Sequence, residues 1–296
     1  MLNKNGLLLL LTILLWGTVW YAIKFQLGET PIIVSIFYRI LIAAVALLGW
    51  CLATTNIPSL NIRDHAYLTL MGFLLFSGNY YCFYVATDHI ESGLVSIIFS
   101  TLVLINSINK RLFFRDRISK AVVLGGIVGV MGVSLLFSEE LRGDRYSAER
   151  VTGILYALLG TYMVSIGNMI SARFSRKNVP VLVSTGFGLS YGAVLCGLLI
   201  VWQGYTLTIP MTSEYLFSLI YLSLFCTALA FLLYLTLVKN SGPDKAALAT
   251  ILFPLVAMII SSVLEGYVWS LAAIVGGFLI LLGYSISLFY GKPKSN

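Results

Sequence analysis

The sequence predicts an all-α integral membrane protein with ten transmembrane helices. The 296 residues are 59% hydrophobic and 10% charged, with a mean hydropathy of +0.93, whereas a soluble domain is about 25% charged. The apolar residues gather in long runs, each close to the roughly 20 residues that a helix needs to cross the hydrocarbon core. Backbone groups find no water partners in lipid, so runs of this length are predicted as helices and not as the alternating strands of a barrel.

The ten predicted spans follow one another along the chain with short connections. Hydropathy places them at residues 6–24, 33–54, 66–86, 92–110, 119–138, 151–172, 180–202, 214–238, 245–264 and 268–290. The first run resembles a signal peptide, but no small-residue cleavage site follows it. We therefore expect an uncut first span.

The distribution of charge predicts the orientation of the spans. With a cytoplasmic N-terminus, the inside segments contain fourteen lysines and arginines and the outside segments contain four. Nine of the twelve acidic residues then lie outside. Because cytoplasmic loops are enriched in Lys and Arg, both termini are expected in the cytoplasm.

The chain divides into two halves of five predicted spans. Residues 1–138 form the first half, 139–150 a charged external loop, 151–290 the second half and 291–296 a cytoplasmic tail. Similar segments recur in the halves: WGT at 16–18 and LGT at 159–161, GLVSIIFSTLV from 93 and AALATILFPLV from 246, GGIVGVMG from 125 and GGFLILLG from 276. Five is odd, so the second half enters the membrane from the opposite side. Such inverted repeats predict alternating access around a central cavity.

Two spans of the first half supply the main candidates for lining this cavity. Trp16, Trp20 and Lys24 share one helical face, with Tyr21 beside them. The run GNYYCFYVATDH contains Asn79, Tyr80 and Tyr84; an amide in mid-span needs a partner or a cavity. Aromatic walls with a few polar groups are typical of small-molecule pockets. Interface belts and ordinary packing are the alternative interpretations.

The second half supplies weaker candidates. Tyr162 and Tyr234 are further aromatic residues within spans. Asn168 lies near the cytoplasmic end of its span, as Asn106 and Asn109 do, where helix capping or interhelical hydrogen bonding competes with an inner-gate contact. Pro254 breaks a backbone hydrogen bond, which either exposes a carbonyl to the cavity or only kinks the helix.

One arginine, Arg39, lies roughly 9 Å inside the second span, in the run SIFYRILIAAVALLGW. Its side chain leans toward the outer interface and could reach water there. It could also form an ion pair with Glu29, Asp88 or Glu91. The third interpretation is a direct contact with substrate, for which Lys24 is a similar candidate. Structural pairing or snorkelling is slightly favoured.

Several functional motifs are absent from the sequence. It contains no GxxxxGK[ST] or HExxH pattern, so neither direct ATP use nor a zinc hydrolase site of the HExxH type is expected. The four cysteines lie in apolar runs without metal-ligand spacing and are expected to be buried. We predict no cofactor and no metal. The pairs Gly125/Gly129 and Gly188/Gly192, with Gly276 and Gly283, predict close helix packing.

The position of charge also bears on substrate and energy coupling. No acidic residue lies deep within a predicted span, whereas proton-driven carriers usually place a carboxylate or histidine there. This favours a facilitator or exchanger. Lys24 and Arg39 with no buried acid favour carboxylates or zwitterions over organic cations.

The segments LLWGTVWYAIKF, YRILIAA, LFFRDRIS…GGIVGVMG and ALATILFPLVAMIISSVLEG…GGFLILLG carry a resemblance over nearly the whole chain. They resemble the drug/metabolite transporter superfamily, in its ten-helix EamA-type branch. Pro254 and Glu265 stand where the family pattern has a proline and a glutamate. In the first half the pattern departs, with Thr101 in place of the proline and Asp116 in place of the glutamate. The resemblance implies small-metabolite transport, commonly export of amino acids.

We therefore expect a secondary transporter, not an enzyme. It would move small metabolites, most of all amino acids or related carboxylated compounds, across a bacterial cytoplasmic membrane by alternating access, in the direction of export. Multidrug efflux is the alternative and a polytopic membrane enzyme a remote one. The expected partners are a small-molecule substrate and membrane lipid, not nucleic acid, with the chain as a monomer or homodimer.

Overall fold

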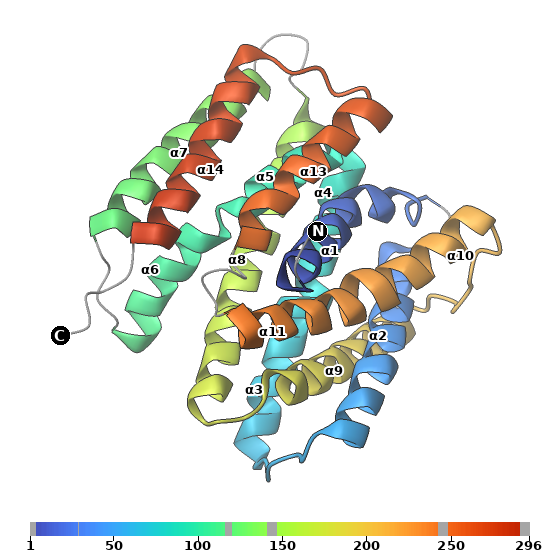
Figure 1. Cartoon of the computed structure of the whole chain (residues 1–296). Helices are drawn as coiled ribbons and strands as arrows, with labels where there is room; N and C mark the ends of the chain where they lie inside the picture. The colour runs from blue at the N-terminus through green and yellow to red at the C-terminus, as the bar shows by residue number, and fades with distance from the viewer. Residues whose placement is uncertain (1–3, 29, 116–119, 141–146, 242–247, 291–296) are drawn as a thin grey trace.

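The computed structural model of the chain describes residues 4–28, 30–115, 120–140, 147–241 and 248–290. Within these ranges every regular element is a helix, which confirms the all-α prediction (Figure 1). Seven helical stretches there are long and apolar enough to cross a membrane, and three shorter apolar stretches lie at 120–135, 252–264 and 271–286. Each coincides with one of the predicted spans.

The first half contains the following helices: α1 (Lys4–Lys24), α2 (Ile32–Thr54), α3 (Ile62–Gly72), η1 (Phe73–Ser77), α4 (Gly78–His89), α5 (Ser92–Ser100), α6 (Leu102–Phe114) and α7 (Lys120–Glu140). The elements α3, η1 and α4 form one continuous apolar stretch, Ile62–His89. Thr101 separates α5 from α6 and donates its hydroxyl proton to the Ile98 carbonyl at 2.7 Å.

The second half contains α8 (Ala148–Arg176), α9 (Val181–Trp202), α10 (Ser213–Ile220), η3 (Tyr221–Leu229), α11 (Ala230–Ser241), α13 (Leu248–Leu264) and α14 (Leu271–Tyr290). The predicted external loop is shorter than expected at both ends. Residues 139–140 continue α7, and Ser147 caps α8 by accepting from the Arg150 amide. Residues 141–146 and the predicted tail lie outside the described residues.

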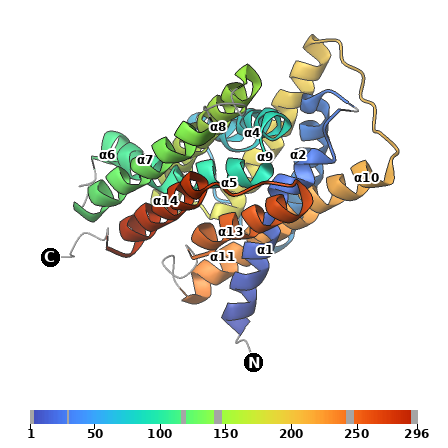
Figure 2. The same cartoon turned by 90° about the horizontal axis from the view of Figure 1, so that it is seen from above.

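The helices pack mainly across the two halves of the chain. The pairs are α7 with α14, α2 with α9 and α5 with α13. In addition, α1 packs against α11, η3 and α13, while α8 packs against α4, α5 and α6. The α7–α14 pair lies at one side of the bundle in both views (Figures 1 and 2). No half could bury its apolar faces alone, because most partners come from the other half.

In the described part of the chain two helical stretches have wider π turns, and both lie in the third predicted span of their half. In η1 the Ser77 hydroxyl donates to the Gly72 carbonyl at 3.3 Å, five residues back. In η3 the Thr227 hydroxyl donates to the Leu222 carbonyl at 2.8 Å, again five residues back. A π turn shifts the faces of the helix that follows it, and such turns are frequent at functional sites.

The predicted glycine contacts are confirmed. A Cβ added at Gly72 in α3 would meet the backbone of Gly188 and lie 2.8 Å from the Gly192 nitrogen in α9. A Cβ at Gly283 in α14 would lie 2.7 Å from the Gly129 nitrogen in α7. These glycines let backbones touch where larger residues would separate the helices.

The α3–α9 contact gives the first testable prediction. Gly72→Ala should lower the free energy of unfolding by about 2 kcal/mol, because overpacking a close contact forces the backbones apart. Gly49→Ala in α2 is the matched control, since no atom outside its own helix turn lies within 4 Å of an added Cβ there. Thermal unfolding in detergent should show a lower midpoint for Gly72→Ala only. An equal loss in both variants would contradict the packing role.

Candidate functional site

Arg39 is the central feature of the candidate site. It lies in α2 and is only 3% exposed. Its guanidinium carbon lies 4.2 Å from the centre of the Tyr80 ring and 6.0 Å from that of Tyr84, both in α4 after the π turn η1. Helix α2 also packs against η3, whose Cys226 lies with Tyr84 in one buried cluster. Arg39 therefore lies between the two spans that contain π turns.

The ion pairs predicted for Arg39 with Asp88 and Glu91 are wrong. The Asp88 side chain is 55% exposed and lies 4.0 Å from His89, while Glu91 pairs with Arg150 at 2.9 Å. Snorkelling is also wrong, because the Arg39 side chain is buried and does not reach the surface. Glu29, the third proposed partner, lies outside the described residues. Within those residues tyrosine rings surround the guanidinium where an anion was expected, and its Nε has no hydrogen-bond partner.

A buried polar group beside Arg39 was not predicted. The Tyr84 hydroxyl donates to the side-chain carbonyl of Gln26, which is fully buried just after α1. The Gln26 amide nitrogen has no partner. Nearby, the hydroxyls of Ser35 and Tyr215 share a hydrogen bond of 2.9 Å. A glutamine at a predicted span end has no distinguishing pattern, so only the three-dimensional contact identifies it.

An aromatic cluster forms a second part of the site. Trp16 lies 5.1 Å from Tyr234 and 6.4 Å from Phe253, measured between ring centres. Trp20 lies edge-on to Phe83 at 5.1 Å and stacks on Phe253 at 6.4 Å. Helices α1, α4, α11 and α13 thus bring three of the predicted candidates, Trp16, Trp20 and Tyr234, into one cluster.

Two buried polar atoms near this cluster have no partner. They are the Trp20 indole nitrogen and the Asn79 side-chain oxygen, in residues that are 6% and 3% exposed. Asn79 lies one helical turn before Phe83, whose ring contacts Trp20. It also directly precedes Tyr80, whose ring lies beneath Arg39. Pro254 is buried within α13, next to Phe253. Unpartnered buried polar groups are rare in native proteins, so this pair indicates a place for a ligand or water.

The remaining candidates lie elsewhere. Tyr21 packs edge-on against Phe25 at 5.3 Å and faces a groove between α1 and α10. Tyr162 is 49% exposed, on the same face of α8 as Leu155 and Leu159, which are also exposed.

Asn168 takes part in interhelical hydrogen bonding, one of the interpretations left open for it. Its amide donates to Asn106 at 3.5 Å, and Asn109 donates to Ser165 at 2.8 Å. These bonds join α6 to α8.

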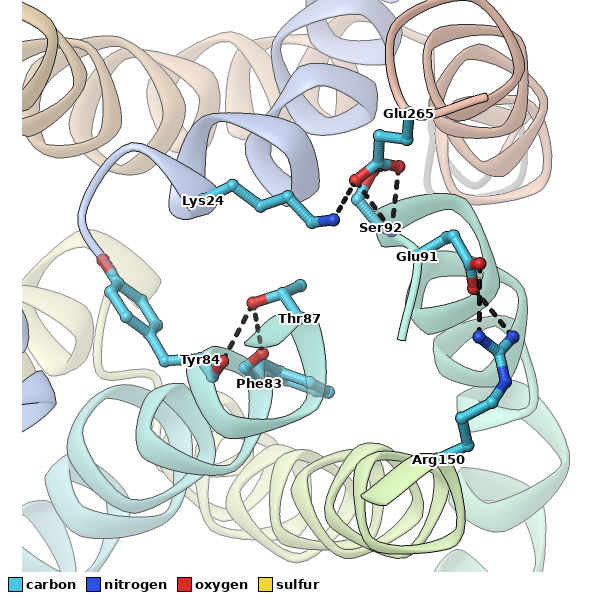
Figure 3. Close-up of polar contacts among 8 residues, drawn as sticks. All are labelled: Lys24, Phe83, Tyr84, Thr87, Glu91, Ser92, Arg150 and Glu265. Atoms are coloured by element: carbon cyan, nitrogen blue, oxygen red, sulfur yellow. Dashed lines mark hydrogen bonds and ion pairs between the residues drawn. The ribbon is translucent and has the colours of Figure 1, made fainter. Parts of the chain in front are cut away.

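Lys24 forms an ion pair at the end of the bundle nearest Arg150. Its Nζ lies 2.5 Å from Oε1 of Glu265, whose side chain is 5% exposed. Glu265 also accepts from the Ser92 amide at 3.0 Å and the Ser92 hydroxyl at 2.7 Å. Figure 3 shows this group beside the Glu91–Arg150 pair. The two ion pairs join α1, α5, α8 and the end of α13.

Known proteins resemble this chain over its full length. A family model described as the EamA-like transporter family matches residues 4–138 and 151–289. The chain belongs to this family. The resemblance inferred from the sequence motifs is confirmed, and the protein is a multi-pass membrane transporter and not an enzyme.

Relatives of this EamA-like transporter occur in several bacteria. The uncharacterized transporter YvbV of Bacillus subtilis is 25% identical, covering 99% of this chain and 93% of its own. Protein PagO of Salmonella typhimurium is 22% identical, covering 96% and 91%. A protein crystal structure with a TM-score of 0.67 is 21% identical and covers 97% of both chains. That structure supports the fold.

The charge environment of Glu265 has a consequence for stability. Burial raises the pKa of this carboxyl, but the hydrogen bonds from Lys24 and Ser92 outweigh it, so the pKa lies below its ordinary value of 4.5. A carboxyl with a lowered pKa in the folded state stabilises the protein fully above its unfolded-state pKa. That contribution is lost as the pH falls below 4.5 and through the folded-state pKa.

The lowered pKa of Glu265 leads to a second prediction. The unfolding midpoint of the wild-type protein should fall more steeply below pH 4.5 than that of Glu265→Gln, and at pH 7 the variant should be the less stable protein. Glu149→Gln, at an exposed position, should follow the wild-type pH profile. Thermal unfolding in detergent between pH 3 and 7 measures all three. Parallel profiles for wild type and Glu265→Gln would exclude the stabilising role of the carboxylate.

Proposed function

We propose that this protein is a secondary transporter of small carboxylated metabolites, amino acids above all, in which Arg39 binds the substrate carboxylate. The observation that carries the proposal is a buried guanidinium which, within the described residues, has tyrosine rings against it but no carboxylate. Charges inside membrane proteins mark substrate and ion pathways by default.

The energetics of Arg39 support an anionic ligand. Taking a charge out of water costs several kcal/mol even after relaxation. Contact with aromatic faces returns about 2 kcal/mol when desolvated. A substrate carboxylate would supply the missing charge-assisted hydrogen bonds, including one to the free Nε. The site therefore favours binding a small anion or zwitterion over remaining empty.

The neighbouring groups suit the rest of an amino acid. Asn79 is the residue next to Tyr80, and its side-chain oxygen is free to accept a hydrogen bond from an ammonium group. The aromatic cluster around Trp20 offers apolar contact for a side chain. An amino acid with an apolar side chain matches all three features.

Two further features support alternating access by inverted repeats of five spans each. The family model matches two separate segments of similar length. The helix contacts also correspond between the halves: α1 packs on the third and fourth spans of the second half, as α8 does on those of the first. The π turns occupy corresponding spans. In this scheme the Lys24–Glu265 and Glu91–Arg150 pairs close one end while substrate exchanges at the other.

Substitution of Arg39 tests the proposal directly. In proteoliposomes, Arg39→Leu should reduce uptake of radiolabelled L-phenylalanine and L-leucine by about tenfold to a hundredfold, the value of a hydrogen bond to a charged group. Arg39→Lys should retain part of the activity, since it keeps the charge but loses the planar stacking on tyrosine. Arg63→Leu, an exposed arginine at the start of α3, is the matched control and should transport normally.

Competition identifies the group that Arg39 recognises. Unlabelled L-phenylalaninamide, which lacks the carboxylate, should not compete with L-phenylalanine for the wild-type protein. Normal uptake by Arg39→Leu would refute the carboxylate site. Preferred transport of a quaternary ammonium drug would favour multidrug efflux instead.

Energy coupling is a separate part of the proposal. We infer a facilitator or exchanger working in the direction of export, because the described parts of the predicted spans bury no carboxylate midway that would relay protons. Preloading the liposomes with unlabelled L-phenylalanine should accelerate uptake, whereas a pH gradient alone should not drive accumulation. Accumulation driven by the pH gradient in empty liposomes would contradict this mode.

A further inference from the structure

The structure contains a groove on the side of the bundle that the proposed function does not use. It is lined by one face of α1 and one face of α10, ending at Tyr221 in η3, and has a volume of about 580 Å³. Small-molecule sites typically measure about 300–1,000 Å³. Helix α1 packs along α11 and η3, whereas α10 packs on η3 and α2. The two helices thus diverge toward the Lys24 end and leave the groove between them.

The walls of the groove contain four aromatic rings and one charge. Tyr21 and Phe25 form one wall, and Phe217 stacks on Tyr221 in the other at 6.3 Å with nearly parallel rings. Glu214 is exposed and lines the groove from the first turn of α10. Such walls suit an apolar side chain, and the carboxylate suits an ammonium group.

A single hydrogen bond closes the inner end of the groove. The hydroxyls of Thr18 and Tyr221 lie 2.6 Å apart, and both residues line the groove. Next to this hydrogen bond, the Cys226 thiol donates to the Leu15 carbonyl at 3.4 Å. Cys226 and Tyr84 belong to one buried cluster, against which Tyr221 and Tyr80 pack. This cluster connects the inner end of the groove to the two tyrosine rings that lie against Arg39.

The element that contains this barrier is suited to opening. Tyr221 and Cys226 both belong to the π turn η3, whose wider turn is less regular than an α-helix. Rotation of the Tyr221 ring away from Thr18 would open the groove toward the buried cluster that contains the two tyrosines against Arg39. Breaking one hydrogen bond between neutral hydroxyls costs only about 1 kcal/mol.

We propose that this groove is a lateral portal through which a zwitterionic amino acid with an apolar side chain passes between the bilayer and Arg39. The proposal rests on Arg39 being the carboxylate site of the proposed function. Glu214 binds the ammonium group at the groove, the aromatic walls contact the side chain of the amino acid, and Arg39 binds its carboxylate. The Thr18–Tyr221 hydrogen bond is the gate.

Blocking the groove tests the route. Phe25→Cys places a thiol in the groove at a residue that is 43% exposed, and reaction with pyrenylmaleimide fills it. The matched control is Val45→Cys, 68% exposed in a second lateral groove of about 290 Å³ between α2 and α9. Wild-type protein treated in the same way controls for its four buried native cysteines. The readout is the initial rate of radiolabelled L-phenylalanine uptake into proteoliposomes, before and after reaction.

The portal predicts that modification of Phe25→Cys lowers this rate by about tenfold or more, as expected when an access route is closed, while modified Val45→Cys and wild type keep theirs. Unchanged uptake in modified Phe25→Cys, with uptake lost in Arg39→Leu, overturns the portal and leaves the proposed function standing. Equal loss in both modified variants also overturns it, because the effect would not depend on this groove. Normal uptake in Arg39→Leu overturns the proposed function instead.

Discussion

Hydrocarbon offers no partner for a backbone hydrogen bond, and this constraint decides both the fold and the position of the candidate site. Because of this constraint, every described regular element is a helix. Where the described chain departs from the α pattern, the Ser77 and Thr227 hydroxyls also donate to the carbonyls five residues before them. The departures coincide with the site, since Tyr80 follows one π turn and Cys226 lies within the other.

The spans and the glycine contacts could be predicted because both depend on local properties, namely hydropathy and residue size. Contacts between distant helices could not. The sequence shows that Trp16, Trp20 and Lys24 share one helical face. It does not show that Lys24 pairs with Glu265, or that Trp20 packs against Phe83 and Phe253. Nor does any pattern distinguish Gln26 from an ordinary polar residue at a span end. Periodicity gives the face of a helix, whereas the partner that covers it depends on the whole fold.

The surroundings of Arg39 explain why Asp88 and Glu91 do not form the ion pairs predicted for it. Acidic residues near the same end of the bundle have other roles: Glu91 binds Arg150, and Asp88 is exposed. A guanidinium can instead lie against tyrosine rings, which stabilise it without neutralising it. Among the described residues no carboxylate pairs with Arg39, whereas Glu265 neutralises Lys24.

Helix α1 connects the features that would have to change together during transport. Its C-terminal Lys24 holds the ion pair with Glu265, Thr18 holds the groove shut against Tyr221, and Trp20 lies in the aromatic cluster. These residues occupy neighbouring turns of one helix, so a rigid movement of α1 away from η3 and α13 would disturb all three contacts at once. The ion pair is the strongest of them, since charge-assisted bonds exceed neutral ones about twofold. Its release would therefore limit the movement, and a portal gated by a neutral hydrogen bond could open more readily than the end of the bundle.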